Sequence, residues 1–135
     1  MSENIILIPV YNDWKSLNKL LLEINSKSNR NVLIKILIIN DCSTQKIEIK
    51  RSKLNKIKEV KVLTLNQNLG SQRAIAIGLD YLKKLNTKSF ITIMDGDGED
   101  DPNEINKMLL LAQKNVNYII TSNRTERNEN LFIRA

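Results

Sequence analysis

Five acidic side chains fall within seven consecutive positions of this chain: Asp95, Asp97, Glu99, Asp100 and Asp101. Carboxylates this close together repel one another unless a cation lies among them. The cluster directly follows residues 89–94, an apolar run typical of a buried strand. Open α/β sheets bind their ligands at the carboxyl ends of strands. We therefore predict a divalent-metal site at this cluster.

A solvated turn, a calcium loop or a phosphatase motif accounts less well for the acidic cluster. A solvated turn before a capped helix explains Asp101, because Asp and Gly are common turn residues, but it leaves Asp95 and Asp97 unexplained. An EF-hand loop starting at Asp95 needs Gly at position 100 and Glu at position 106, and the chain has neither. A strand followed by Asp-x-Asp also resembles the haloacid dehalogenase phosphatases, which have Thr or Val where Glu99 stands.

The composition indicates one globular domain with a basic surface. A length of 135 residues suits a single domain, and the apolar fraction of 41% is ordinary. The formal net charge is +6, and residues 46–61 are the most basic stretch. This stretch is either a solvated helix face or a surface for phospholipid or another polyanion. It contains no aromatic residue for base stacking, so we expect no nucleic-acid partner.

The numbers of cysteine and histidine residues limit the catalytic groups available to the chain and indicate its cellular compartment. Cys42 is the one cysteine, which excludes an intrachain disulfide and favours a reducing compartment such as the cytoplasm. The first residues lack the basic and apolar regions of a signal peptide, and no apolar run is long enough to cross a membrane. Histidine is absent, so the commonest general base and every imidazole metal ligand are excluded.

Apolar runs rich in β-branched residues alternate with segments of helical period, which predicts an α/β fold with a mostly parallel sheet. The expected strands are residues 5–10, 32–39, 60–65, 90–94 and 118–121. The first expected helix buries one face and is capped by Asp13; its buried face is Trp14, Leu17, Leu20, Leu21 and Ile24. A second helix is expected within residues 70–85. A third is expected from Pro102, with Asp101 as cap and a buried face of Ile105, Met108, Leu109 and Ala112.

Polar residues gather where the expected strands end. They lie within three strand-end segments, residues 8–13, 38–44 and 66–73, in addition to the acidic cluster. Pro9 cannot donate to a sheet ladder, so the first strand must stop or stay unpaired there. Because parallel strands end at the same edge of a sheet, we expect these four loops to form one pocket.

The order of these motifs resembles the N-terminal half of the family 2 glycosyltransferases of the GT-A fold. The motifs are Pro-Val-Tyr-Asn at 9–12, Asn-Asp-Cys-Ser-Thr at 40–44, Asn-x-Gly-x-x-x-Ala-x-x-x-Gly-Leu at 68–79, and Asp-x-Asp at 95–97. Residues 95–102 further resemble the polyprenyl-phosphate (dolichyl-phosphate) mannose synthase branch, in which Asp-x-Asp-x-Gln precedes a Pro-led helix. The resemblance implies a three-layer, Rossmann-like half of a GT-A domain, with helices on both faces of the sheet. Residues 1–135 would then be one nucleotide-sugar-binding domain that ends before the acceptor side.

The resemblance also implies roles for individual residues. Pro9, Tyr11 and Asp13 would line the base and ribose end of a nucleotide-sugar pocket, and Asp41 would bond to the base or ribose. Gly70 and Arg73 would lie beside the nucleotide, and Arg124 would contact phosphate. Asp95 would face ribose or metal, Asp97 would bind Mg²⁺ or Mn²⁺ on the diphosphate, and Glu99 would be a further ligand.

The chain departs from the family pattern at three of these motif positions. Asn40 and Cys42 replace an Asp and a Gly of the usual Asp-Asp-Gly-Ser loop, and Glu99 replaces the Gln of the mannose synthase branch. If the Gly position needs a positive φ, Cys42 is strained by roughly 1 kcal/mol. Glu99 adds a charge, which would tighten metal binding or alter the contact with the sugar.

The expected function is metal-dependent transfer of a sugar from a UDP- or GDP-sugar to a polyprenyl-phosphate or glycan acceptor. The expected location is the cytoplasm, with peripheral contact at the inner face of the membrane as a further possibility. The catalytic residues are not identified, because the general base of most family members comes later than Ala135. Two alternatives remain: a truncated or degenerate domain that binds nucleotide and metal without turnover, and a polyanion-binding module that uses residues 46–61.

Overall fold

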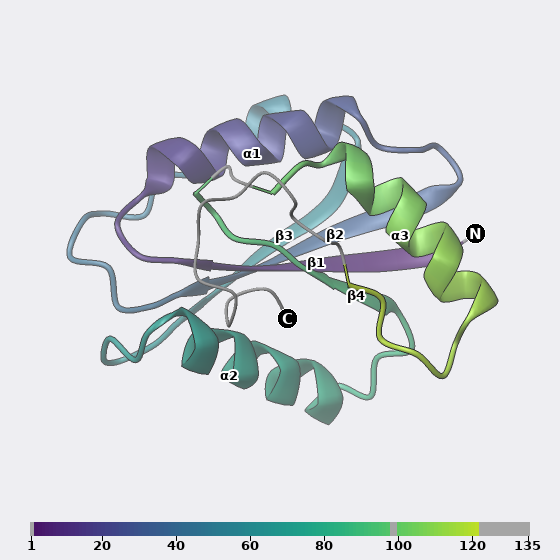
Figure 1. Cartoon of the computed structure of the whole chain (residues 1–135). Helices are drawn as coiled ribbons and strands as arrows, with labels where there is room; N and C mark the ends of the chain where they lie inside the picture. Colours follow the sequence, from purple (N-terminus) through teal and green to yellow (C-terminus); the bar gives the residue numbers. More distant parts are fainter. Residues whose placement is uncertain (1, 98–99, 122–135) are drawn as a thin grey trace, which may run out of the picture. The chain divides into compact units, whose positions relative to one another are not determined.

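The structure is a computed structural model that describes residues 2–97 and 100–121. Strands and helices alternate along the chain (Figure 1). The elements are β1 (Ser2–Val10), α1 (Trp14–Ser26), β2 (Val32–Asn40), the 3₁₀ helix η1 (Arg51–Lys53), β3 (Ile57–Thr64), α2 (Ser71–Lys84), β4 (Phe90–Ile93) and α3 (Asn103–Lys114).

The strands form one sheet in the order β3-β2-β1-β4, and every pairing is parallel. α1 and α2 lie on opposite faces of this sheet (Figure 1). β1 is central and pairs with β2 along its whole length, from Ser2 opposite Val32 to Val10 opposite Asn40. The predicted α/β fold with a parallel sheet and helices on both faces is confirmed, and the carboxyl ends of the strands meet at one edge.

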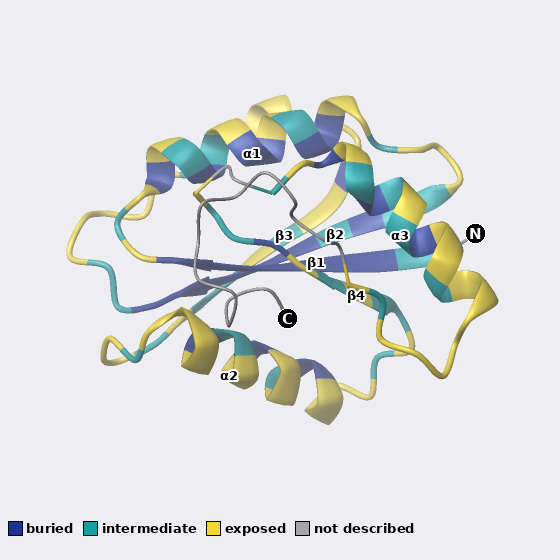
Figure 2. Cartoon of the chain, viewed as in Figure 1, coloured by how far each residue is buried: buried dark blue, intermediate teal, exposed yellow. Residues whose placement is uncertain are grey.

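Side-chain alternation along β1 divides the core between the two faces of the sheet. Ile5 and Leu7 pack in one cluster with Ala74 and Leu82 of α2. Ile6 and Ile8 are fully buried on the opposite face, the side of α1. All the residues predicted for the buried face of α1 are buried, as the dark inner side of this helix in Figure 2 shows. Asp13 caps the helix as predicted, because its Oδ1 accepts from the backbone N–H of Ser16.

Small residues bring α2 close to the sheet. Ala74 is fully buried, and a Cβ added to Gly78 would lie 2.6 Å from a methyl group of Leu7 and 3.2 Å from one of Ile39. The Ala-x-x-x-Gly spacing therefore places two small residues on the helix face that contacts β1 and β2. This close packing fixes the position of the N-terminal end of α2.

The chain divides into two compact units, one ending at Pro102 and one beginning at Asn103. α3 belongs to the second unit. It begins one residue after the Pro102 start predicted from the sequence, a difference that is common at helix ends. Ile105 and Leu109 are buried, while Met108 and Ala112 are half-buried, which confirms the predicted stripe.

Two expectations about secondary structure are wrong. Residues 118–121 form no strand in the described part of the chain; instead the N–H of Tyr118 donates to the carbonyl of Asn115 in a turn. A strand requires a pairing partner, which a β-branched composition alone does not supply. Residues 46–61 are not a helix face, because they form a loop, η1 and most of β3. Within the described residues, no helix has the length and apolar character needed to cross a membrane.

Candidate functional site

A cleft of about 370 Å³ opens at the carboxyl edge of the sheet, within the first unit. Its volume is in the range of small-molecule sites. The residues that line it come from the loops after β1 and β4 and from the start of α2: Pro9, Val10, Tyr11, Asp13, Ser71, Asp95, Gly96 and Asp97. The structure thus brings together five residues predicted to bind nucleotide or metal, namely Pro9, Tyr11, Asp13, Asp95 and Asp97.

The two aspartates reach the cleft because Gly96 lets their loop pass close to the end of β1. A Cβ on Gly96 would lie 3.2 Å from a methyl group of Val10 and 3.3 Å from the carbonyl oxygen of Pro9. The loop is also tied internally, since the backbone N–H of Asp95 donates to the carboxylate of Asp100 at 2.8 Å. Asp100, for which the sequence alone indicated no role, therefore shapes the loop that presents Asp95 and Asp97.

Further residues that line the cleft come from the turn between β1 and α1. Tyr11 is 48% exposed, so a flat aromatic ring is available at the cleft. Asp13 lines the cleft and also caps α1 through its Oδ1 atom. The cap holds this carboxylate in place, and Tyr11 and Asp13 together offer one stacking surface and one hydrogen-bond acceptor.

The N-terminus of α2 completes the cleft through Ser71, which was not among the residues predicted from the sequence. Gly70 precedes the helix with φ 90°, a conformation that favours glycine. Ser71 is the first helical residue, where unpaired backbone N–H groups and the helix dipole favour an anion. Its position directly after the Gly of the strand-to-helix motif was the available signal. The cleft thus combines two carboxylates for a cation with a helix end that favours phosphate.

Asp41 is buried at 3% exposure and bridges two loops instead of lining the cleft. Its two carboxylate oxygens accept from the backbone N–H groups of Leu69 at 2.8 Å and Gly70 at 2.9 Å. The side chain of Asn68 also donates to the backbone carbonyl of Asp41. Asp41 therefore positions the start of α2, and its predicted contact with a base or ribose stays a prediction.

Asn12 joins the loop after β1 to the loop after β2. Its Oδ1 accepts from the backbone N–H groups of Thr44 at 2.8 Å and Gln45 at 3.0 Å, while its own N–H donates to Ser43. Asn12 has φ 61°, which Asn tolerates better than most residues. With the bonds from Asp41, these contacts connect three consecutive loops, so the rim of the cleft is held by hydrogen bonds.

The loop after β2 departs from the family pattern at Asn40 and Cys42, and its hydrogen bonds and backbone angles show how both residues are accommodated. The amide of Asn40 accepts from the N–H of Ser43 and donates to the hydroxyl of Thr64. Cys42 has φ 59°, so the positive φ on which the strain prediction depended is present. A non-glycine residue in this conformation carries backbone strain of about 1–2 kcal/mol.

Replacing Cys42 with Gly is expected to raise the free energy of unfolding by about 0.5–1 kcal/mol, because relief of strain exceeds the extra entropy of Gly in the unfolded chain. Urea denaturation of the native chain and of Cys42→Gly measures the change. Cys42→Ala is the matched control, since it removes the thiol and keeps the strain. Equal midpoints for the Gly and Ala variants would show that backbone strain at this position is negligible.

The donor set of the cleft fits a hard divalent cation that is bound together with phosphate. Mg²⁺ commonly takes one or two carboxylates and completes its shell with substrate phosphates and water. Asp95 and Asp97 supply two carboxylates. Among residues 2–97 and 100–121, no three acidic or cysteine side chains group as a complete metal site. The third predicted ligand, Glu99, lies outside the described residues, as does the predicted phosphate contact Arg124.

Two further predicted positions lie near the cleft without lining it. Gly70 forms the N-cap of α2, one residue before the cleft residue Ser71. Arg73 is exposed in the first turn of α2 and is not among the cleft-lining residues. Its predicted position beside the nucleotide stays a prediction.

A second cavity, of about 270 Å³, is lined by two ion pairs. Glu3 forms an ion pair with Lys35 at 3.1 Å, and Glu59 forms one with Lys61 at 3.8 Å. A hydrogen bond from Ser89 and the nearby Lys35 lower the pKa of Glu3. The first cleft lies at the carboxyl edge of the parallel sheet, where open α/β sheets bind their ligands, so we take it as the functional site.

The fold and the cleft define an α/β domain that binds its ligand at the carboxyl edge of a parallel sheet. The model of glycosyl transferase family 2 matches residues 5–135, and the chain belongs to this family. No curated protein matches the chain significantly. Members of the family transfer glycosyl groups from activated sugar donors, so this is a glycosyltransferase domain.

Proposed function

We propose that the domain binds a UDP- or GDP-sugar in the cleft and transfers the hexosyl group to a polyprenyl-phosphate or glycan acceptor. The observation that carries this proposal is that Tyr11, Asp13, Asp95 and Asp97 converge on one cleft with the N-terminus of α2. An aromatic ring, acidic acceptors and a helix dipole match the base, ribose and diphosphate of such a donor. The proposed place of action is the cytoplasm, at the inner membrane face for a lipid-linked acceptor.

In this proposal different residues of the cleft bind different parts of the donor. Pro9, Tyr11 and Asp13 hold the base and ribose, and the diphosphate lies between Ser71 and the loop of Asp95 and Asp97. Asp97, with Asp95, would hold Mg²⁺ or Mn²⁺. When bound, the cation offsets the negative charge that develops on the departing nucleoside diphosphate.

A polyprenyl phosphate is an acceptor that could react without any general base. The acceptor attacks the anomeric carbon of the sugar, and a phosphate oxygen is already anionic, so this reaction requires no general base. A glycan hydroxyl would require one. Among the described residues of the cleft, Asp13 is the carboxylate outside the Asp95–Asp97 pair, and its Oδ1 already accepts from Ser16. The resemblance of residues 95–102 to the polyprenyl-phosphate mannose synthase branch supports this acceptor.

The Oδ1 atom of Asp13 is already engaged in the cap of α1. This favours a second candidate function, a domain that binds donor and metal without turnover. Release of nucleoside diphosphate from a nucleotide sugar in the presence of polyprenyl phosphate separates the two candidates. The active enzyme releases it in proportion to acceptor, whereas a binding domain retains the donor unchanged.

Calorimetric titration of UDP and GDP into the chain, with Mn²⁺ or with EDTA, tests the donor site. We expect one of the two nucleotides to bind at least about tenfold more tightly with Mn²⁺, because the cation links the diphosphate to two carboxylates. Equal affinity with Mn²⁺ and EDTA would contradict the proposed metal-dependent site.

A further inference from the structure

Most of the net charge of the chain is concentrated in residues 46–61, which we call the basic segment. It contains seven basic and two acidic side chains, a net charge of +5 out of +6 for the whole chain. All six of its lysines are exposed; apart from Lys61, which pairs with Glu59, they are Lys46, Lys50, Lys53, Lys56 and Lys58. None of these five forms an ion pair with an acidic residue in the described part of the chain. Their charge is therefore available to an external anion.

Two asparagines of α1 hold the first part of the basic segment in a defined conformation. Asn18 donates to the carbonyl of Glu48 at 2.7 Å and accepts from the N–H of Lys50 at 2.9 Å. Two turns later, Asn25 is only 9% exposed and accepts from the N–H of Lys56 at 2.8 Å. These bonds fix the backbone while the lysine side chains stay exposed.

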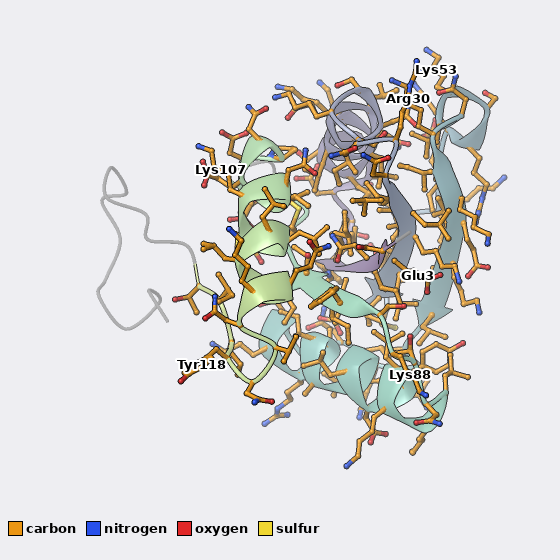
Figure 3. All side chains as sticks on the ribbon, turned by 90° about the vertical axis from the view of Figure 1, so that its right-hand side faces the viewer. Glu3, Arg30, Lys53, Lys88, Lys107 and Tyr118 are labelled. Carbon is orange, nitrogen blue, oxygen red and sulfur yellow. The ribbon has the colours of Figure 1, made fainter. Side chains whose placement is uncertain are left out.

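Edge-strand protection explains only the end of the basic segment. β3 is an edge strand of the sheet, and lysines on an edge hinder pairing with other chains. This accounts for Lys58 and Lys61, which lie within β3. Lys46, Lys50, Lys53 and Lys56 precede the strand and need another reason. In Figure 3 the side chain of Lys53 extends outward at the end of the molecule where Arg30 also lies.

The chemistry of the basic segment favours an anionic lipid surface over a nucleic acid. The segment has no aromatic side chain on which a base could stack. It does expose Ile47, at 40%, beside the lysines. Basic side chains next to an exposed apolar one suit the phosphates and the interface of a bilayer.

The basic segment also begins at the rim of the donor cleft. Thr44 and Gln45, immediately before it, donate to the side chain of Asn12. Asn12 in turn lies between Tyr11 and Asp13, both of which line the cleft. Only this first part of the segment lies close to the cleft, because Asn25, at the far end of α1, holds Lys56, and the segment then enters β3 at the amino edge of the sheet.

We propose that the basic segment docks this domain on an anionic phospholipid surface. The docking itself needs no donor and no catalysis.

Sedimentation with vesicles of phosphatidylcholine alone, and of phosphatidylcholine mixed with phosphatidylglycerol, tests the proposal. The native chain should bind the mixed vesicles only, and the binding should fall with salt. The triple variant Lys50→Gln, Lys53→Gln, Lys56→Gln should bind about 100-fold more weakly, since each lysine near an anionic membrane contributes substantially. The matched control, Lys83→Gln, Lys88→Gln, Lys114→Gln, removes the same charge from exposed positions elsewhere and should bind like the native chain.

Three outcomes would overturn the docking proposal: no binding to mixed vesicles, equal loss in both triple variants, or tighter binding to single-stranded poly(U) than to the vesicles. Thermal melts by circular dichroism confirm that both variants are folded. Calorimetric titration with nucleoside diphosphate and Mn²⁺ is run in parallel without lipid. A chain that binds nucleotide and ignores vesicles refutes the docking alone, whereas the reverse result refutes the donor site alone.

Discussion

Replacing Asp97 with Asn is expected to weaken Mn²⁺-dependent binding of nucleoside diphosphate by about 100-fold or more. Loss of residues that merely support a metal ligand already lowers metal affinity by about 10–100-fold, and Asp97 is a proposed direct ligand. The amide oxygen of Asn is neutral, so it does not replace the charge that attracts the cation. Calorimetric titration of the nucleotide into Asp97→Asn, with saturating Mn²⁺, measures the loss.

Asp101→Asn is the matched control for this experiment. It removes one negative charge from the same cluster, but Asp101 does not line the cleft. Both positions are exposed, so neither change should unfold the chain. If the two variants lose affinity equally, general attraction by the acidic cluster explains the binding and the specific role of Asp97 is wrong. Unchanged binding in both variants would remove the metal site from this loop.

The fold could be predicted because its signals are local in the chain. β1 and β2 are continuous β-branched runs, and the buried stripe of α1 follows a clear helical period. Residues 118–121 show the limit of this approach, since they have the composition of a strand and no strand partner in the described part of the chain. The basic segment shows another limit, because side-chain bonds from Asn18 and Asn25 determine its path.

The sequence predicts which loops form the candidate site, but it does not predict which way their side chains point. Parallel topology alone brings the loops after β1 and β4 to one edge, which explains why Tyr11, Asp13 and Asp97 line the same cleft. Asp41 follows its strand in the same way, yet its carboxylate turns to the next loop. Whether a side chain lines the cleft or bonds to a neighbouring loop depends on local backbone angles, such as the positive φ of Cys42, and on which N–H groups lie within reach.

Replacing Asp41 with Ala is expected to lower the free energy of unfolding by about 3 kcal/mol and Tm by about 10 °C. The change leaves the part-buried N–H groups of Leu69 and Gly70 without their carboxylate acceptor. A hydrogen bond to a charged group contributes about 1.5–3 kcal/mol, and we take the lower end for each of these two part-buried bonds. Because Gly70 begins α2 and Ser71 lines the cleft, nucleotide affinity should fall as well. Urea denaturation and calorimetric titration measure the two effects.

Asp80→Ala is the matched control for stability, because Asp80 is an exposed carboxylate on α2 that pairs only with Lys84 among the ion pairs of the described residues. An exposed ion pair within one helix contributes little, so this variant should unfold close to the native chain. The loss of nucleotide affinity in Asp41→Ala is then measured well below its Tm, where the chain is folded. A variant that is destabilised but binds normally would show that Asp41 supports the fold without positioning α2 for the donor. A variant as stable as the native chain would mean that water satisfies Leu69 and Gly70 and that the bridge between the loops contributes nothing net.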